Sequence, residues 1–167
     1  SRILMADGSV LATFYDENRV YVPLDKIAPV MQDAQIAIED HRFYEHGAID
    51  IQGLGRAFFR TAMGDTQGAS TLTQQYVKLV QVEAAVARGD EEAAREAVAV
   101  NLERKIREMR YAMAVEDRLS KDEILEGYLN IAYYGAGAYG VEAAAHRYWN
   151  TTAEDLTLDQ AAMLAGM

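Results

Sequence analysis

The stretch GASTLTQQYVKLV, residues 68–80, combines a helix start with a run of polar side chains. Ser70 and Thr71 both suit the N-cap of an α-helix, because a hydroxyl there accepts a hydrogen bond from a free backbone amide. Apolar residues follow at helical spacing, namely Leu72, Tyr76 and Leu79. The sequence therefore predicts a helix that begins at Ser70 or Thr71 and buries one side.

A polar line of side chains runs along the same helix, beside the apolar stripe. Thr71, Gln75 and Lys78 occupy positions i, i+4 and i+7, which share one side of a helix. Capping accounts for the hydroxyl residues, but it does not account for Gln74, Gln75 and Lys78. Because the free amides of a helix N-terminus favour negative charge, we expect this side of the helix to face an anion.

The composition of the 167 residues restricts the class of protein. Hydrophobic residues make up 50% of the chain and only two residues are proline, which is typical of one ordered domain with a sizeable core. The chain has no cysteine, which excludes a disulfide framework, a thiolate metal site and a cysteine nucleophile. A net charge of −10 argues against nucleic acid as a partner. Within 100–110, however, four basic residues stand against two acidic ones, so a local cationic surface remains available.

The N-terminal residues carry the only clear β pattern. Asp7-Gly8 separates two alternating apolar stretches within 3–15, which predicts a β-hairpin, and RVYVPL, residues 19–24, could add a third short strand. Helical patterns dominate afterwards. We therefore expect a single domain over the whole chain, with a hairpin and linker region in 1–26 and a helical body in 27–167.

The C-terminal part of the chain shows two further helix starts. Ser120 with Glu123, and Thr157 with Gln160, have the spacing of a capping box. No clear terminator follows the second start, TLDQAAMLAGM, so we expect the sequence to be a truncated piece of a longer protein. No apolar run approaches the roughly 20 residues that a membrane-spanning helix needs, and no signal-peptide pattern opens the chain.

From Asn101 to about Leu119 the apolar residues follow one helical face: Leu102, Ile106, Met109 and Met113. Arg104, Lys105 and Glu108 must then point elsewhere, and their spacing allows them to share another face. Two interpretations stay open. The three side chains form surface ion pairs worth about 0.3–0.5 kcal/mol, or they form a phosphate-binding face whose acid is held by its cationic neighbours.

EDHRFYEH, residues 39–46, ends an apolar helix with a carboxylate pair that aromatic residues follow. Such a setting would desolvate Glu39 and raise its proton affinity, as a general acid or base near neutral pH requires. The alternative is that Glu39 and Asp40 are ordinary solvated acids at a helix end. The three histidines lack metal-ligand spacing such as HExxH, so we expect no histidine-built metal site.

Four motifs occur in one order along the chain: EDHRFYEH (39–46), QGASTLTQQYVK (67–78), RKIRE (104–108) and KDEILEGYLN (121–130). This set resembles the ordered motifs of the peptidoglycan glycosyltransferases, glycosyltransferase family 51, which are the polymerase domains of class A penicillin-binding proteins and their single-domain relatives. The resemblance covers nearly the whole chain. It implies a mainly α, lysozyme-like glycosyltransferase fold with a small N-terminal β-hairpin, on the extracytoplasmic face of the bacterial cytoplasmic membrane.

The resemblance also implies a reaction, in which lipid II is polymerised into β1,4-linked glycan strands with inversion and undecaprenyl pyrophosphate leaves. Glu39 matches the catalytic base, which takes the proton from the sugar 4-hydroxyl of the incoming lipid II. Glu108 matches a second catalytic glutamate. We expect it to organise Arg104, Lys105 and a divalent metal, Mg²⁺ or Mn²⁺, around the pyrophosphate rather than to donate a proton. No organic cofactor is implied.

Other motif residues are expected to contact lipid II and the growing lipid-linked glycan chain. By the resemblance, the substrate-binding set is Asp40, Phe43, His46, Gln67, Gly68, Ser70, Thr71, Gln74, Gln75, Lys78, Arg104 and Lys105. Structural support of the site is expected from Glu126, Tyr128 and Asn130. An apolar segment with scattered arginines would either contact the membrane surface or form a buried amphipathic helix, and its apolar residues are Phe58, Phe59 and Met63.

Two departures from the family pattern and two alternative functions remain. Leu79 stands where relatives often have asparagine, and an acidic stretch in 83–96 lengthens the link to RKIRE, as a solvated helical insertion would. A lytic transglycosylase or lysozyme-like hydrolase is the nearest alternative enzyme, although the cationic residues argue against a neutral polysaccharide substrate. The other alternative is a non-catalytic lipid II-binding module. We expect a C-terminal transpeptidase domain in the full-length protein.

Overall fold

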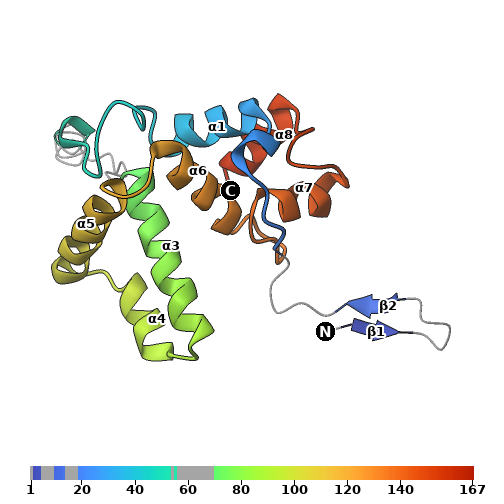
Figure 1. Ribbon diagram of the computed structural model, residues 1–167, viewed down its shortest axis with the longest axis horizontal. Coiled ribbons are helices and arrows are strands. Elements are labelled where there is room, and N and C mark those ends of the chain that lie inside the picture. Colours follow the sequence, from blue (N-terminus) through green and yellow to red (C-terminus); the bar gives the residue numbers. More distant parts are fainter. Residues whose placement is uncertain (1, 5–9, 14–18, 54, 56–69) are drawn as a thin grey trace.

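The computed structural model describes residues 2–4, 10–13, 19–53, 55 and 70–167, and this part of the chain is mainly helical (Figure 1). The described α-helices are α1 (Pro29–Glu39), α3 (Leu72–Ala87), α4 (Glu91–Val98), α5 (Leu102–Glu116), α6 (Lys121–Ile131), α7 (Val141–Trp149) and α8 (Leu158–Ala165). A short 3₁₀-helix, η1 (Leu24–Lys26), precedes α1. The expected mainly α class is confirmed.

Two short strands, β1 (Arg2–Leu4) and β2 (Val10–Thr13), pair in antiparallel fashion. The residues that would make the turn at Asp7-Gly8 lie outside the described residues, so the hairpin stays a prediction. The third strand expected at 19–24 is wrong. There the backbone N–H and C=O of Val22 pair with the side-chain amide of Asn130 on α6, at 2.9 and 2.8 Å, so a helix side chain takes the place of a neighbouring strand.

α3 runs through the middle of the helical body, where α4, α5 and α6 all contact it (Figure 1). Thr71 is its N-cap and accepts a hydrogen bond of 3.3 Å from the Gln74 backbone N–H, which confirms the predicted helix start. α6 approaches α3 closely at Gly127, where an added Cβ would lie 2.7 Å from the ring of Tyr76. The absence of a side chain at this position therefore lets the two helices meet.

The main hydrophobic core lies where α1, α6, α7 and α8 meet. α1 packs against α8, and the largest wholly buried side chains of the cluster are Phe43, Ile27, Met31, Leu72, Ile124, Leu125, Leu129, Leu164 and Val141. Each such side chain contributes about 1.5–3 kcal/mol by leaving water. A small separate cluster of Ala48, Val77 and Ala112 lies between α3 and α5.

The acidic insertion forms the end of α3, a turn and α4. The chain reverses at Gly89, whose φ of +68° is a conformation that glycine adopts without strain. Asp90 then caps α4 by accepting a hydrogen bond of 2.9 Å from the Ala93 backbone N–H, and α4 packs back against α3. The insertion is helical, as predicted, and its break falls at the RGD triplet.

The apolar face expected on α5 is not its buried face. Leu102 and Ile106 are 75% and 50% exposed, whereas Glu108 is only 4% exposed and Ala112 is wholly buried. Ala112 permits close packing against α3, and the buried Glu108 pairs with Arg104 and Lys105 of its own helix, of which Lys105 also bonds to Gln74 on α3. Helical periodicity groups side chains into faces, but the neighbouring helix decides which face it covers.

The remaining helix starts follow local sequence signals. Asn101 caps α5 by accepting a hydrogen bond of 2.7 Å from the Arg104 backbone N–H. Ser120 and Glu123 form the predicted capping box of α6, and the Gln160 side chain accepts a hydrogen bond of 3.0 Å from the Thr157 backbone N–H ahead of α8. Among the described helices, none has both the length and the apolar character needed to cross a bilayer.

Candidate active site

Glu39 lies at the C-terminal end of α1, half-buried, and a glutamine of α3 holds its carboxylate. The Gln75 side-chain amide donates a hydrogen bond of 2.6 Å to Glu39 Oε2. The carbonyl oxygen of the same amide accepts a hydrogen bond of 3.4 Å from the Tyr128 hydroxyl on α6. Three helices therefore contribute one side chain each to a row that ends at Glu39.

The charge of Glu39 acts on two buried tyrosines. The pKa of Tyr128 is raised, first by burial and then by the negative charge of Glu39. Burial, Tyr128 and Glu39 together raise the pKa of Tyr134, whose hydroxyl donates a hydrogen bond of 3.3 Å to Gln35. Both phenols stay protonated at physiological pH, so Tyr128 remains a hydrogen-bond donor to Gln75.

Glu108 lies on α5 and binds two cations of its own helix. Its Oε2 pairs with Arg104 Nη1, and its Oε1 accepts a hydrogen bond of 2.6 Å from Lys105 Nζ. Lys105 Nζ also donates to Ser70 Oγ at 2.6 Å and to Gln74 Oε1 at 2.9 Å, so its three N–H groups are all used. Since Glu108 is buried, these contacts are not the surface ion pairs that spacing alone left open.

Gln74 and Gln75, adjacent on α3, each interact with a different one of the two carboxylates. Gln75 binds Glu39, whereas Gln74 binds Lys105 and through it Glu108. Successive residues of an α-helix point about 100° apart. The start of α3 therefore binds the two acids through side chains that point in different directions.

The segment after α1 holds the start of α3 in place. Asp40 Oδ2 accepts a hydrogen bond of 3.0 Å from the Leu72 backbone N–H, and its Oδ1 lies 2.6 Å from Nε2 of His46. The Thr71 hydroxyl donates a hydrogen bond of 2.9 Å to the carbonyl oxygen of Ala48. EDHRFYEH thus supplies both Glu39 and the attachment point of the helix that binds it.

Four residues expected to contact substrate are buried in the structure, namely Asp40, Phe43, Thr71 and Gln74. Phe43 is wholly buried and the Lys121 ammonium lies 4.5 Å from the centre of its ring. Thr71 and Gln74 are also buried, and their side chains bond to Ala48 and Lys105. In the structure these enclosed side chains hold the site together, and their contact with a ligand stays a prediction.

The polar line predicted on α3 divides into three environments. Thr71 is buried, Gln75 is half-buried against Glu39, and Lys78 is exposed. Within the described ranges, Lys78 forms no ion pair. Lys78 is therefore the cation of this helix that remains available to an anion.

The residues of the last motif, 121–130, have two roles: some hold a neighbouring segment in place and one reaches the candidate active site. The backbone N–H of Leu24 donates a hydrogen bond of 2.7 Å to Glu126, and the Tyr21 hydroxyl donates to the same carboxylate. This hydrogen bond, with burial, raises the pKa of Tyr21 to about 12. Glu126 and Asn130 thus fasten the segment before η1, while Tyr128 is the member that reaches Gln75.

Sequence reasoning missed a buried polar cluster beneath the second motif. The Thr73 hydroxyl donates a hydrogen bond of 2.5 Å to Glu116 Oε1, which also accepts one of 2.7 Å from Lys121 Nζ. Thr73 is wholly buried, and the cluster links α3, the end of α5 and the start of α6. The sequence feature that could have indicated this cluster is Thr73, a polar residue of the second motif to which no role had been assigned.

Five predicted residues lie outside the described residues, namely Gln67, Gly68, Phe58, Phe59 and Met63.

The described ranges contain no group of three or more histidine or acidic side chains able to hold a metal ion. Both oxygens of Glu108 already contact cations. A divalent metal at the pyrophosphate stays a prediction.

Comparison with known proteins decides the family of the chain. Residues 7–167 match the family described as Transglycosylase. The chain belongs to this transglycosylase family. It is 43% identical to penicillin-binding protein 2D of Bacillus subtilis (strain 168) over 171 residues, which cover 100% of the chain and 23% of that protein. It is 42% identical to penicillin-binding protein 1A of Escherichia coli (strain K12) over 168 residues, which cover 99% of the chain and 18% of that protein.

The chain spans roughly a fifth of the length of these curated relatives, and the same holds for penicillin-binding protein 1A of Neisseria flavescens, which is 38% identical over 167 residues. The four ordered motifs therefore identified the family correctly. The transglycosylase domain has the peptidoglycan glycosyltransferase function that the motifs predicted.

Proposed function

We propose that this protein polymerises lipid II into β1,4-linked glycan strands, with inversion at the anomeric carbon and release of undecaprenyl pyrophosphate. The observation that carries the proposal is a pair of carboxylates, Glu39 of α1 and Glu108 of α5, that are both linked by hydrogen bonds to the start of α3. Glu39 binds a neutral amide, whereas Glu108 binds two cations. One acid is therefore suited to accept a proton and the other to arrange positive charge.

Glu39 would act as the base that removes the proton of the sugar 4-hydroxyl. Gln75 binds Oε2 of this carboxylate, and among the described residues none bonds to Oε1, which stays available to the hydroxyl. A general base must lie within hydrogen-bond reach of its proton, so a carboxylate held in one orientation is favoured. Gln75 would therefore position the base, in addition to any contact with the donor.

Arg104, Lys105 and Lys78 would neutralise the pyrophosphate as its charge develops. Glu108 arranges the first two cations within the protein, and Lys78 on α3 has no ion-pair partner among the described residues. Proton donation by Glu108 is disfavoured, because both of its oxygens are engaged by cations. A divalent metal bound mainly by pyrophosphate oxygens is compatible with this arrangement.

Inversion would require room for an acceptor sugar between Glu39 and Glu108. Inverting glycosidases keep their two carboxyl groups about 6.5–9.5 Å apart, so that an acceptor fits between them. Here Gln75 binds Glu39, whereas Gln74 reaches Glu108 only through Lys105. An acceptor sugar would enter on the Glu39 side while the leaving group departs on the cationic side.

The surroundings of the domain form part of the same proposal. Because the similar penicillin-binding proteins are about five times longer than this chain, we propose that a transpeptidase domain follows it. The domain would work on the extracytoplasmic face of the bacterial cytoplasmic membrane. Phe58, Phe59 and Met63 would contact the membrane there.

Incubation of the purified protein with lipid II tests the proposal, with and without Mg²⁺ or Mn²⁺. We expect glycan polymer from the wild type, none from Glu39→Gln, and lipid II binding that is largely retained in that variant. Full activity of Glu39→Gln would contradict the assigned base. Cleavage of preformed glycan without polymerisation would favour the hydrolase, and binding without any reaction would favour the binding module. Lys78→Glu should weaken donor binding mainly.

A further inference from the structure

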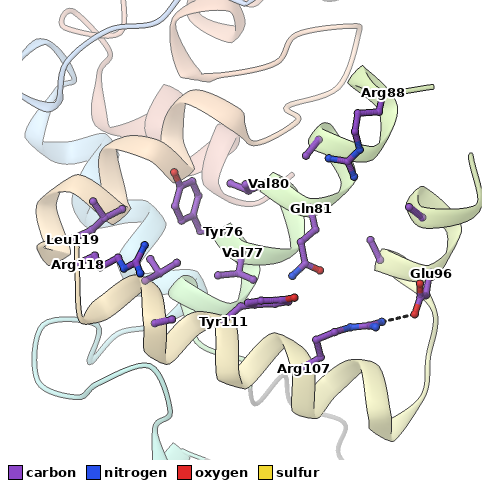
Figure 2. A pocket seen from close by; sticks show the side chains of 15 residues that line it. Tyr76, Val77, Val80, Gln81, Arg88, Glu96, Arg107, Tyr111, Arg118 and Leu119 are labelled. Atoms are coloured by element: carbon purple, nitrogen blue, oxygen red, sulfur yellow. Dashed lines mark hydrogen bonds and ion pairs between the residues drawn. The ribbon is translucent and has the colours of Figure 1, made fainter. Parts of the chain in front are cut away.

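A cavity of about 730 Å³ lies between the C-terminal half of α3, α4 and α5, apart from the candidate active site (Figure 2). Neither Glu39 nor Glu108 lines it. It exists because the chain reverses at Gly89 and α4 folds back beside α3. The acidic insertion therefore creates a groove that the catalytic proposal does not use.

The floor of the groove is mainly apolar. Four alanines line it where the helices would otherwise fill the space: Ala84, Ala93, Ala97 and Ala114. Larger apolar groups lie between them, and two of these, Val80 and Tyr111, remain 40% and 50% exposed. Cavities of about 300–1,000 Å³ with mostly apolar walls and a few polar groups are typical of small-molecule sites.

Three arginines face this apolar floor, in a protein whose net charge is −10. Arg107 on α5 pairs with Glu96 on α4 at 2.5 Å, and this ion pair closes one side of the groove. Within the part of the chain that the structure describes, Arg88 and Arg118 form no ion pair. Figure 2 shows Arg88 near one end of the groove and Arg118 near the other.

This combination selects the chemistry of a ligand. An apolar body would cover Val80 and Tyr111, while an acidic group would accept hydrogen bonds from a guanidinium that pairs with no described residue. Arg107 and Arg118 are eleven positions apart, which corresponds to roughly 16 Å along a helix at 1.5 Å per residue. A single extended hydrocarbon chain fits that length.

We propose that the groove binds an anionic single-chain amphiphile, an acyl or isoprenyl chain that ends in a carboxylate or phosphate. The chain lies along the alanine-lined floor, and Arg88 or Arg118 binds the acidic end. This proposal does not depend on the reaction at Glu39. A protein partner that presents an acidic amphipathic helix is the competing occupant, but the size of the cavity favours the smaller ligand.

Direct binding measurements with dodecyl phosphate test the proposal, below its micelle concentration, by calorimetry on the purified protein. Dodecyl phosphocholine has the same chain without net charge and serves as the comparison ligand. We expect dodecyl phosphate to bind at least tenfold more tightly. Ala84→Trp should abolish this binding by filling the groove, whereas Ala87→Trp, on the same helix but outside the groove, should retain it.

Charge variants distinguish the groove from the cationic active site. Arg88→Gln or Arg118→Gln should weaken dodecyl phosphate binding at least fivefold, and Arg95→Gln, an exposed arginine of α4 outside the groove, should not. Lys78→Glu should leave this binding intact, because Lys78 does not line the groove. Binding that depends on Lys78 and not on Ala84 would overturn the proposal. So would equal affinity for the two ligands, or Ala84-dependent binding of an acidic peptide without binding of dodecyl phosphate.

Discussion

Gln75 donates a 2.6 Å hydrogen bond to the carboxylate of Glu39, across the junction of α3 and α1. The preceding residue, Gln74, accepts a hydrogen bond of 2.9 Å from Lys105 on α5. Two consecutive glutamines thus bind the two halves of the candidate active site. The first turns of α3 therefore set the geometry between the base and the cationic side.

Gln75→Leu should lower kcat about 10- to 100-fold, since a hydrogen bond to a charged group contributes about 1.5–3 kcal/mol. KM should change much less, because the lost contact holds the base. Tyr128→Phe is the matched control, since it removes only a 3.4 Å bond between neutral groups and should cost less than about fivefold. The kinetics of lipid II polymerisation measure kcat and KM for both variants. A rise in KM alone for Gln75→Leu would make Gln75 a substrate contact instead.

Glu108→Gln should lower the free energy of unfolding by roughly 3 kcal/mol, because it leaves Arg104 and Lys105 partly buried without their acid. Urea denaturation measures the change. Arg95→Gln breaks the ion pair with Glu91, whose side chains are both more than 80% exposed, and should leave the midpoint unchanged. Equal midpoints for both variants would show that the Glu108 cluster does not stabilise the fold.

Asp40→Asn should destabilise the protein by about 1–2 kcal/mol, because it removes the charge that binds the Leu72 backbone N–H at the start of α3. Hydrogen exchange should become faster at that amide in particular. Asp90→Asn is the control, since Asp90 also serves a helix start and asparagine caps equally well. Unchanged exchange at Leu72 would contradict the anchoring role of Asp40.

Stability should fall between pH 10 and pH 12 in a manner that depends on Tyr21. Its hydrogen bond to Glu126, with burial, raises its pKa from 10.0 to about 12. In that window the unfolded state loses the phenolic proton and the folded state keeps it, so the free energy of unfolding decreases as pH rises. Urea denaturation at pH 9 and pH 11 should show a smaller decrease for Tyr21→Phe. The same slope in both proteins would remove Tyr21 from this effect.

Local signals in the sequence were sufficient for helix starts and for the family. Thr71 and Ser120 cap their helices as predicted, because a cap needs only residues within one turn of each other. The four motifs were also sufficient to identify a peptidoglycan glycosyltransferase domain, which the family match confirms. The same local reasoning wrongly predicted a strand at 19–24, since a strand must pair with another strand and local sequence does not show which segment lies beside it.

Only the tertiary structure decided which side of each helix is covered. Leu102 and Ile106 looked like a buried face of α5, yet Glu108 is buried instead, because α3 packs closely on that side at Ala112 and its Gln74 binds Lys105, a cationic partner of Glu108. On α3, periodicity grouped Thr71, Gln75 and Lys78, whereas the fold buries Thr71 and bonds Gln75 to Glu39. Lys78 is exposed and forms no ion pair within the part of the chain that the structure describes. Sequence spacing determines which side chains share a direction along one helix. The partners they meet in that direction come from other helices, so burial and contact depend on the fold.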